Sequence, residues 1–266
     1  MNSDILTEIA KKVRMRLETR RKTISLLKLK ELAHQTRRPH RFIDCFSSPG
    51  SSIIAEVKFG SPSLGRFKIE AGEKNAVQIA RSYLESGASA ISVLTEEDFF
   101  DGHSNYLRAI REEFPGAALL MKDFVIDEYQ VYEARVLGAD AVLLIVALLG
   151  EEKTKEFLRL AKTLGLDALV EVHNEEEMIS AVKIKSELIG VNNRNLRTLK
   201  IDLETSKRLF PLASRDSILV CESGLESAKQ IREMRELGFK GFLMGTSFMK
   251  TKNPGQTLAE LLWDLR

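Results

Sequence analysis

The 266-residue sequence lacks features that would mark a secreted or membrane protein. It has only two cysteines, Cys45 and Cys221, which is too few for a disulfide framework and fits two buried thiols in a reducing compartment. The longest apolar run, 141–149, falls well short of the roughly 20 residues needed to cross a bilayer, and the first thirty residues lack an apolar signal core. We therefore expect a soluble, cytoplasmic protein without membrane contacts.

Patterns typical of metal and cofactor sites are also missing. The stretch FGSPSLG, residues 59–65, does not match the GxGxxG turn of dinucleotide-binding sheets, and no Ser-His-Asp arrangement is indicated. His173 could face an outer helical layer. The histidines lack ligand spacing with one another or with the cysteines; they are His34, His40, His103 and His173. We expect no metal and no cofactor, so the chemistry must come from Lys, Glu and Asn.

The N-terminal part of the chain is basic. Although the net charge is only +2, residues 1–41 hold twelve Lys or Arg against four Asp or Glu. Nucleic-acid binding through this arm would favour aromatic side chains for stacking, and none precedes Phe42. Apolar residues recur every four positions, which predicts a helix with a solvated basic face; they are Ile5, Ile9, Val13 and Leu17. An RNA-binding arm stays the alternative from another functional class.

Beyond residue 50, short apolar runs alternate with stretches of helical periodicity. The runs begin near Ile53, Ala90, Ala118, Ala141, Ala168, Leu188, Ile218 and Gly241. Their spacing is too long for hairpins and suits right-handed crossovers between parallel strands. We predict an α/β fold, a (β/α)8 barrel forming a single domain over 1–266, with 1–47 as an N-terminal helical extension over the barrel mouth. A doubly wound open sheet is the alternative.

Helix-to-strand turns support this reading. Helical periodicity stops at Gly87, Gly138 and Gly238, and an apolar run begins shortly after each.

Polar residues follow most of the candidate strands. Thr95 and Glu96 end the second strand less deeply in its apolar run, and the fourth strand ends apolar. The others are Glu56, Lys58, Lys122, Glu171, Asn192, Arg194, Glu222 and Ser223. Singly, each charge could belong to a structural ion pair, but together at one barrel mouth they favour an active site. Glu56 and Lys58, two residues apart, share a strand face.

Two late turns are rich in small residues: ESGLES at 222–227 and LMGTSFM at 243–249. In barrels, the loops after strands seven and eight often bind phosphate through backbone N–H groups. Gly224 and Gly245 would permit close approach, and Thr246 or Ser247 could add a hydroxyl. The alternative is that both glycines merely turn the chain.

Seven stretches in order resemble the indole-3-glycerol-phosphate synthase family. They are AEVKFGSPS, SVLTEEDFFDG, KDFVIDEYQVYEARVLGADAVLLIVALL, LVEVHNEEE, IGVNNRNL, ESGL and GFLMGTSFM. The resemblance implies a (β/α)8 barrel that acts on 1-(2-carboxyphenylamino)-1-deoxyribulose 5-phosphate without metal or cofactor. It implies ring closure with loss of CO2 and water, a step of tryptophan biosynthesis.

The resemblance also implies roles for single residues. Lys122 looks like the general acid that protonates the substrate carbonyl, and Glu171 like its partner in dehydration. Glu56 and Asn192 resemble residues that orient the reacting hydroxyls, and Lys58 a cation near the substrate's carboxylate and phosphate. Binding positions are matched by Ser61, Arg194, Glu222, Ser223, Gly224, Gly245 and Thr246.

A Schiff-base aldolase with Lys58 or Lys122 as nucleophile is the second enzyme hypothesis. In either case we expect a small phosphorylated substrate, no nucleic acid, and a monomer or weak homodimer.

Overall fold

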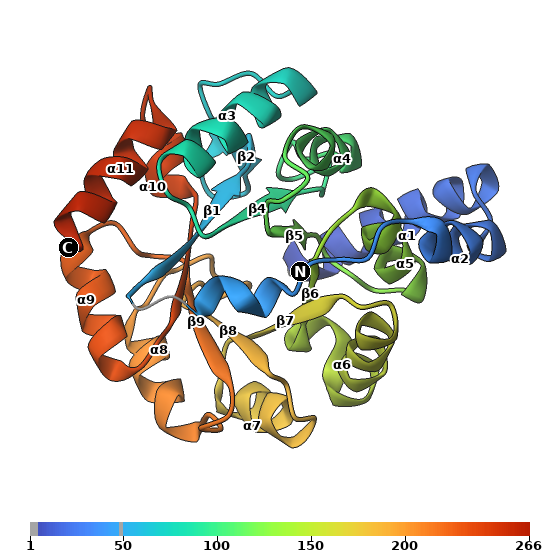
Figure 1. The fold of residues 1–266 in the computed structure, drawn as a ribbon. Helices are drawn as coiled ribbons and strands as arrows, with labels where there is room; N and C mark the ends of the chain where they lie inside the picture. The colour runs from blue at the N-terminus through green and yellow to red at the C-terminus, as the bar shows by residue number, and fades with distance from the viewer. Residues whose placement is uncertain (1–4, 48–49) are drawn as a thin grey trace.

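The computed structural model describes residues 5–47 and 50–266; residues 1–4 of the predicted extension and 48–49 of the predicted domain lie outside these ranges. Eight parallel strands close into a barrel (Figure 1). They are β1 (Ser52–Val57), β4 (Ala90–Leu94), β5 (Leu119–Lys122), β6 (Ala141–Ile145), β7 (Asp167–Val172), β8 (Leu188–Asn192), β9 (Ile218–Glu222) and β10 (Gly241–Met244). The predicted closed barrel is confirmed, and the open sheet is excluded.

Helices follow the strands and form the outer layer (Figure 1). They are α3 (Glu73–Glu85), α4 (Ser104–Glu113), α5 (Glu128–Leu137), α6 (Val146–Thr163), α7 (Glu175–Lys183), α8 (Glu204–Leu209), α9 (Ala228–Leu237), α10 (Thr246–Met249) and α11 (Pro254–Asp264), with a 3-10 turn η2 (Phe210–Leu212). A two-stranded hairpin, β2 (Gly60–Ser61) with β3 (Gly65–Arg66), follows β1. Three helix ends were predicted from Gly87, Gly138 and Gly238. All three glycines have positive φ, which explains the residue type.

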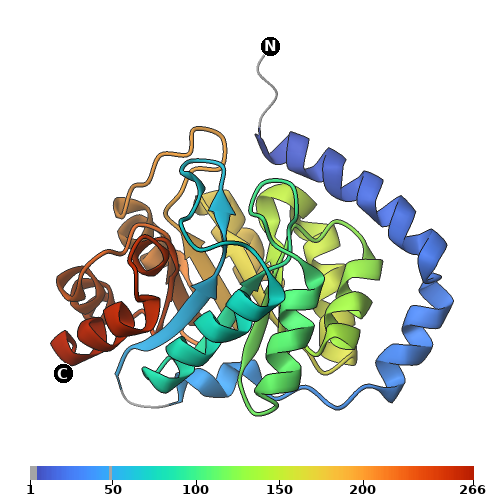
Figure 2. The same ribbon diagram turned by 90° about the horizontal axis from the view of Figure 1, so that it is seen from above.

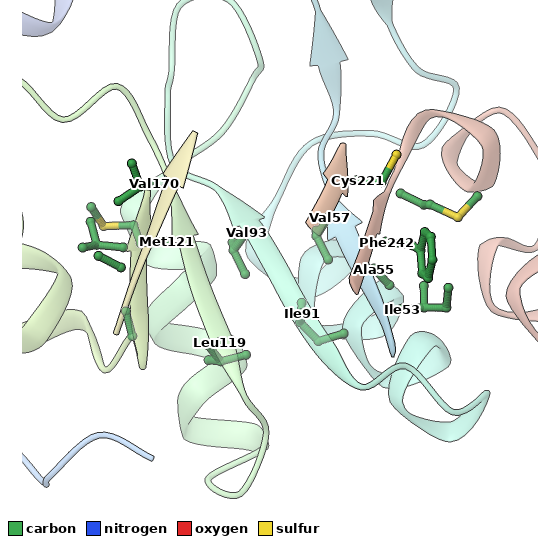
Figure 3. Packing of buried hydrophobic residues seen from close by; sticks show 14 of the residues in the cluster. Ile53, Ala55, Val57, Ile91, Val93, Leu119, Met121, Val170, Cys221 and Phe242 are labelled. Carbon is green, nitrogen blue, oxygen red and sulfur yellow. The ribbon is translucent and has the colours of Figure 1, made fainter. Parts of the chain in front are cut away.

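The barrel is packed in two layers because strand side chains alternate in direction. On β1, Ile53, Ala55 and Val57 belong to the apolar layer between strands and helices, part of which is seen in Figure 3. Ile54 belongs to a second cluster that fills the barrel interior and continues to the N-terminal segment. Glu56 shares the inward phase of Ile54, so the strand itself turns its carboxylate into the barrel.

The N-terminal segment forms α1 (Ile5–Thr23), α2 (Leu26–Gln35) and the 3-10 turn η1 (Phe42–Phe46) before β1. In Figure 2, α1 begins above one end of the barrel and slopes toward its side, and the chain then continues along the side and the opposite end. Ile9, Val13 and Leu17 are buried, as the four-residue spacing predicts.

The sequence predicted a solvated basic face on this segment, but part of that face forms ion pairs with the barrel. Arg16 pairs with the fully buried Glu96 and with Asp98, and Arg20 pairs with Glu97 and Glu133. Because these cations already bind carboxylates of the same chain, fewer of them are left to contact phosphates of RNA. They instead fasten α1 to the β4–α4 loop and α5.

Asp140 links several segments at the end of the barrel where the strands begin. Its fully buried carboxylate accepts hydrogen bonds from Arg111, from the backbone N–H of Leu119 at 2.9 Å, and from Arg37 and the backbone N–H of His40 at 3.0 and 2.8 Å. One carboxylate therefore joins α4, β5 and the returning N-terminal segment.

Both cysteines are free thiols. The expectation that both are buried holds for Cys221 but not for Cys45, which is half-buried. Among the described residues, every helix is either too short or too polar to cross a bilayer.

Candidate active site

Inward-facing positions carry the candidate groups to the carboxyl ends of the strands, the barrel mouth. Leu120, Leu169 and Val220 fill the interior. Two residues beyond each stands, in order, Lys122, Glu171 and Glu222. Since side chains alternate along a strand, the same phase that buries the apolar residue aims the next polar one at the mouth.

Lys122 lies at the centre of a buried charge cluster. Its Nζ is 2.9 Å from Oε2 of Glu171 and 2.7 Å from Oε2 of Glu222. Both carboxylates belong to the predicted site residues, Glu171 as a catalytic group and Glu222 as a binding position. Three side chains from β5, β7 and β9 thus meet in one cluster.

Burial and charge shift these groups in different directions. Burial alone would lower the pKa of Lys122, but the carboxylates of Glu171, Glu222 and Glu56 outweigh it and raise that pKa. Burial likewise opposes ionisation of Glu171, yet Lys122 and His173 hold its pKa below the ordinary value. The pKa of Glu222 is raised, first by burial and then by Glu171.

Glu56 and Lys58 form the second charged pair of the mouth. Lys58 Nζ is 2.6 Å from Glu56 Oε1, so the two charges pair with each other instead of with a neighbouring strand. Gly245 lies against this carboxylate: a Cβ atom there would be 2.7 Å from Cβ of Glu56 and 2.8 Å from its Oε1. Glycine is required here by close approach.

Two adjoining cavities occupy the mouth and share polar walls. The first has an apolar side formed partly by Ile5 and Leu6 of α1 and by Phe100. Of the predicted site residues, it is lined by Glu56, Lys58, Ser61, Lys122, Glu171, Asn192, Arg194, Ser223 and Thr246. The second adds Gly224 and Gly245. Glu222 lies against Lys122, so the structure brings all twelve predicted residues together, while their roles stay predictions.

The second cavity lies between the two predicted phosphate turns. Ser223 and Gly224 have φ of 64° and 84°, a turned backbone that opens this loop toward the cavity. Ser247 also lines it, and its Oγ is buried without a hydrogen-bond partner. A ligand oxygen placed here would supply the missing partner.

The neighbouring Arg194 crosses the boundary between the cavities. Its Nη1 donates to Ser63 Oγ at 3.3 Å and to the backbone oxygen of Leu199 at 3.1 Å. Its backbone N–H donates to Oδ1 of Asn192 at 3.0 Å. The two hydrogen bonds of Nη1 hold the guanidinium in place.

Two residues that contribute to the site were not among the predicted site residues. Gly190 on β8 makes room for Glu222, because a Cβ there would lie 1.9 Å from its Oε1. His173 contacts both the outer layer and the mouth: its Nδ1 is 3.0 Å from Oε2 of Glu177 on α7, as expected, and its Nε2 is 3.2 Å from Oε1 of Glu171. Its place directly after the strand that carries Glu171 was the available signal.

Thr95 and Glu96 stabilise the loops around the mouth through hydrogen bonds and an ion pair. Thr95 donates to Asp123 at 2.6 Å, and Glu96 binds Arg16 and the backbone N–H of Phe99. Within residues 5–47 and 50–266, no group of three or more His, Cys, Asp or Glu side chains could hold a metal ion.

Solved structures of low sequence identity share the fold. 3-Hexulose-6-phosphate synthase from Salmonella typhimurium superimposes with a TM-score of 0.65 at 13% identity, covering 81% of this chain and 100% of that one. N-acetylmannosamine-6-phosphate 2-epimerase from Clostridium perfringens gives 0.60 at 14% identity, covering 85% and 97%. These likenesses establish the barrel alone.

Sequence relatives carry the assignment further. The chain is 42% identical to indole-3-glycerol phosphate synthase of Bacteroides thetaiotaomicron, covering 97% of this chain and 98% of that one. It is 40% identical to that of Acidithiobacillus ferrooxidans, covering 98% and 100%. A family model described as indole-3-glycerol phosphate synthase matches residues 6–261, a span that contains all twelve predicted site residues. By the barrel, the site and these matches, the chain belongs to the indole-3-glycerol phosphate synthase family.

Proposed function

We propose that this protein converts 1-(2-carboxyphenylamino)-1-deoxyribulose 5-phosphate to indole-3-glycerol phosphate, CO2 and water, without metal or organic cofactor. The observation that carries the proposal is that the cavity lined by Lys122 and Glu171 adjoins a second, unlike cavity, with Glu56, Lys58 and Arg194 lining both. One cavity has an apolar wall for an aromatic ring, and the other has glycine turns and an unpartnered Ser247 hydroxyl for a phosphate. Binding energy at the phosphate then orients the distant reacting carbons.

Ring closure needs a proton at the ketone oxygen. As the ring carbon that bears the carboxylate attacks the ketone carbon, the oxygen becomes alkoxide-like and takes a proton from the Lys122 ammonium. The carbon–carboxylate bond then breaks, CO2 leaves, and its electron pair restores the aromatic ring. The raised pKa of Lys122 is compatible with this step, because a developing alkoxide is far more basic than a ketone.

Dehydration removes the new hydroxyl as water. The leaving oxygen takes a proton, and the adjacent carbon of the former sugar loses one as the indole double bond forms. Dehydration is therefore neutral in protons, and the whole reaction takes up the one proton that was added to the ketone oxygen during ring closure. Glu171 and Glu222 both contact Lys122, and their pKa values move in opposite directions. Such divergence separates acid from base duties: Glu222 can carry a proton near neutrality, whereas Glu171 stays anionic.

The other groups hold the substrate. Lys58 faces its carboxylate and phosphate, while Glu56 and Asn192 orient its hydroxyls. Ser61, Arg194, Ser223 and Thr246 complete the walls of the cavities. The chain works as a monomer or weak homodimer in this proposal, since all these groups come from one copy.

The test is turnover by the purified protein. The carboxyphenylamino substrate should give indole fluorescence and an equal amount of CO2, at a rate unchanged by EDTA. A protein that leaves this substrate intact would remove the assignment. Borohydride addition during turnover tests the aldolase alternative: the proposed mechanism yields no covalent adduct, whereas a trapped Lys58 or Lys122 adduct would favour a Schiff base.

Gly245→Ala should lower kcat/KM by about tenfold to hundredfold, because the added methyl group displaces Glu56 and crowds the second cavity. The measurement is steady-state kinetics with the phosphorylated substrate. Gly116→Ala is the matched control, because a Cβ atom there has no neighbour within 4 Å. Equal kinetics in the two variants would show that close approach at Gly245 does not matter.

A further inference from the structure

The imidazole of His173 lies between two carboxylates at the end of β7. Its Nε2 is 3.2 Å from Oε1 of Glu171, and its Nδ1 is 3.0 Å from Oε2 of Glu177 on α7. Glu177 also accepts the backbone N–H of His173 at 2.8 Å and the side-chain amide of Asn174 at 2.6 Å. The ring is thus fixed on the α7 side, while its contact with Glu171 is an ion pair without hydrogen-bond alignment.

This placement requires the charged form of the ring. A neutral imidazole carries one N–H, so the lone pair of its other nitrogen would face a carboxylate oxygen; the imidazolium presents an N–H to each. Burial lowers the pKa of His173, but the neighbouring carboxylates of Glu171 and Glu177 outweigh burial and raise that pKa to about 9. Across the adjoining cavity stand the charged groups of α1 and of the segment from β8 to α8. They are Lys11, Arg14, Arg197, Lys200, Asp202 and Arg208.

The two oxygens of Glu171 have different partners. Lys122 binds Oε2, and His173 faces Oε1. A carboxylate held by one partner alone could rotate about that contact, and a second partner on the opposite oxygen removes this freedom. The contacts form a chain that runs from Lys122 through Glu171 and His173 to Glu177.

We propose that His173 is a positioning residue, which holds the carboxylate of Glu171 in register with Lys122 through the oxygen that the ammonium does not bind. The inference rests on the proposed function, since Glu171 and Lys122 are its reacting groups. Glu177 completes the device by fixing the imidazole in its charged form. Loss of the proton from His173 at alkaline pH releases one side of Glu171 and lowers turnover.

Three variants of the full chain test this role. His173→Gln should lower kcat by about tenfold to hundredfold with a smaller change in KM, and should remove the alkaline fall in rate near pH 9. Glu177→Gln keeps the imidazole but takes away one carboxylate, so the fall should move to lower pH. Glu176→Gln makes the same change at an exposed position of α7 and should match the wild type.

Proton NMR of the histidine rings supplies a readout that does not depend on activity. One ring of the wild type should titrate near pH 9, vanish in His173→Gln, and titrate at lower pH in Glu177→Gln. If His173→Gln does not fold, the Glu177→Gln titration and rate profile decide alone.

An active wild type with unshifted profiles in His173→Gln and Glu177→Gln would overturn the role of His173 and leave the proposed function standing. A wild type that forms no indole product would instead overturn the proposed function.

Discussion

Lys122→Met should lose turnover by about two to four powers of ten, because it removes the ammonium that is the proposed proton donor to the ketone oxygen. The protein should still fold. Methionine fills the same space, His173 still faces Glu171, and Glu222, whose pKa is already raised, can take up a proton and become neutral. The measurement is single-turnover formation of indole fluorescence at saturating substrate.

The control for this variant is Lys229→Met, which removes an exposed ammonium on α9. It should turn over at the wild-type rate. Circular dichroism should show the same helix content in both variants. A Lys122→Met protein with near-parental turnover would remove the lysine from its role as general acid.

Asp140→Asn should lower the free energy of unfolding by about 3–5 kcal/mol, because breaking a buried ion pair leaves its partners charged and uncompensated. Arg111 is nearly buried beside this carboxylate, and Arg37 is half-buried. The amide that replaces one oxygen also faces the N–H groups that the carboxylate accepted. Urea denaturation of the wild type and the variant measures the loss.

The active site lies at the opposite end of the barrel from Asp140, so turnover per folded molecule should stay at the wild-type value. Asp216→Asn, the same change at an exposed position, should leave stability unchanged within about 0.5 kcal/mol. Equal stability of both variants would show that the Asp140 cluster does not hold the N-terminal segment to the barrel.

The strands of the barrel could be predicted because their signal is local. The apolar runs that begin near Ile53, Ala90 and Leu188 start within one residue of the observed strands. Three helices, α3, α5 and α9, end at or just before the glycines that the sequence marked. The convergence of polar strand ends followed from the closed topology itself. No contact had to be known to place Lys122 and Glu171 at one mouth.

The contacts that could not be predicted depend on the room that small residues leave and on pairing between segments far apart in the sequence. Glu222 reaches Lys122 only because Gly190, on the neighbouring strand, leaves room for its carboxylate. Asp140 meets Arg37 from about a hundred residues away, and no periodicity marks that pair. The basic arm seemed solvated because the acidic residues that bind Arg16 and Arg20 lie far along the chain.

The most direct test of the account is the crystal structure of Lys122→Met with the carboxyphenylamino substrate bound. The account predicts the phosphate between the turns at Gly224 and Gly245, the aromatic ring against the apolar wall near Phe100, and the ketone oxygen facing residue 122. A phosphate bound instead in the basic cavity beside Lys11 and Arg208 would contradict it.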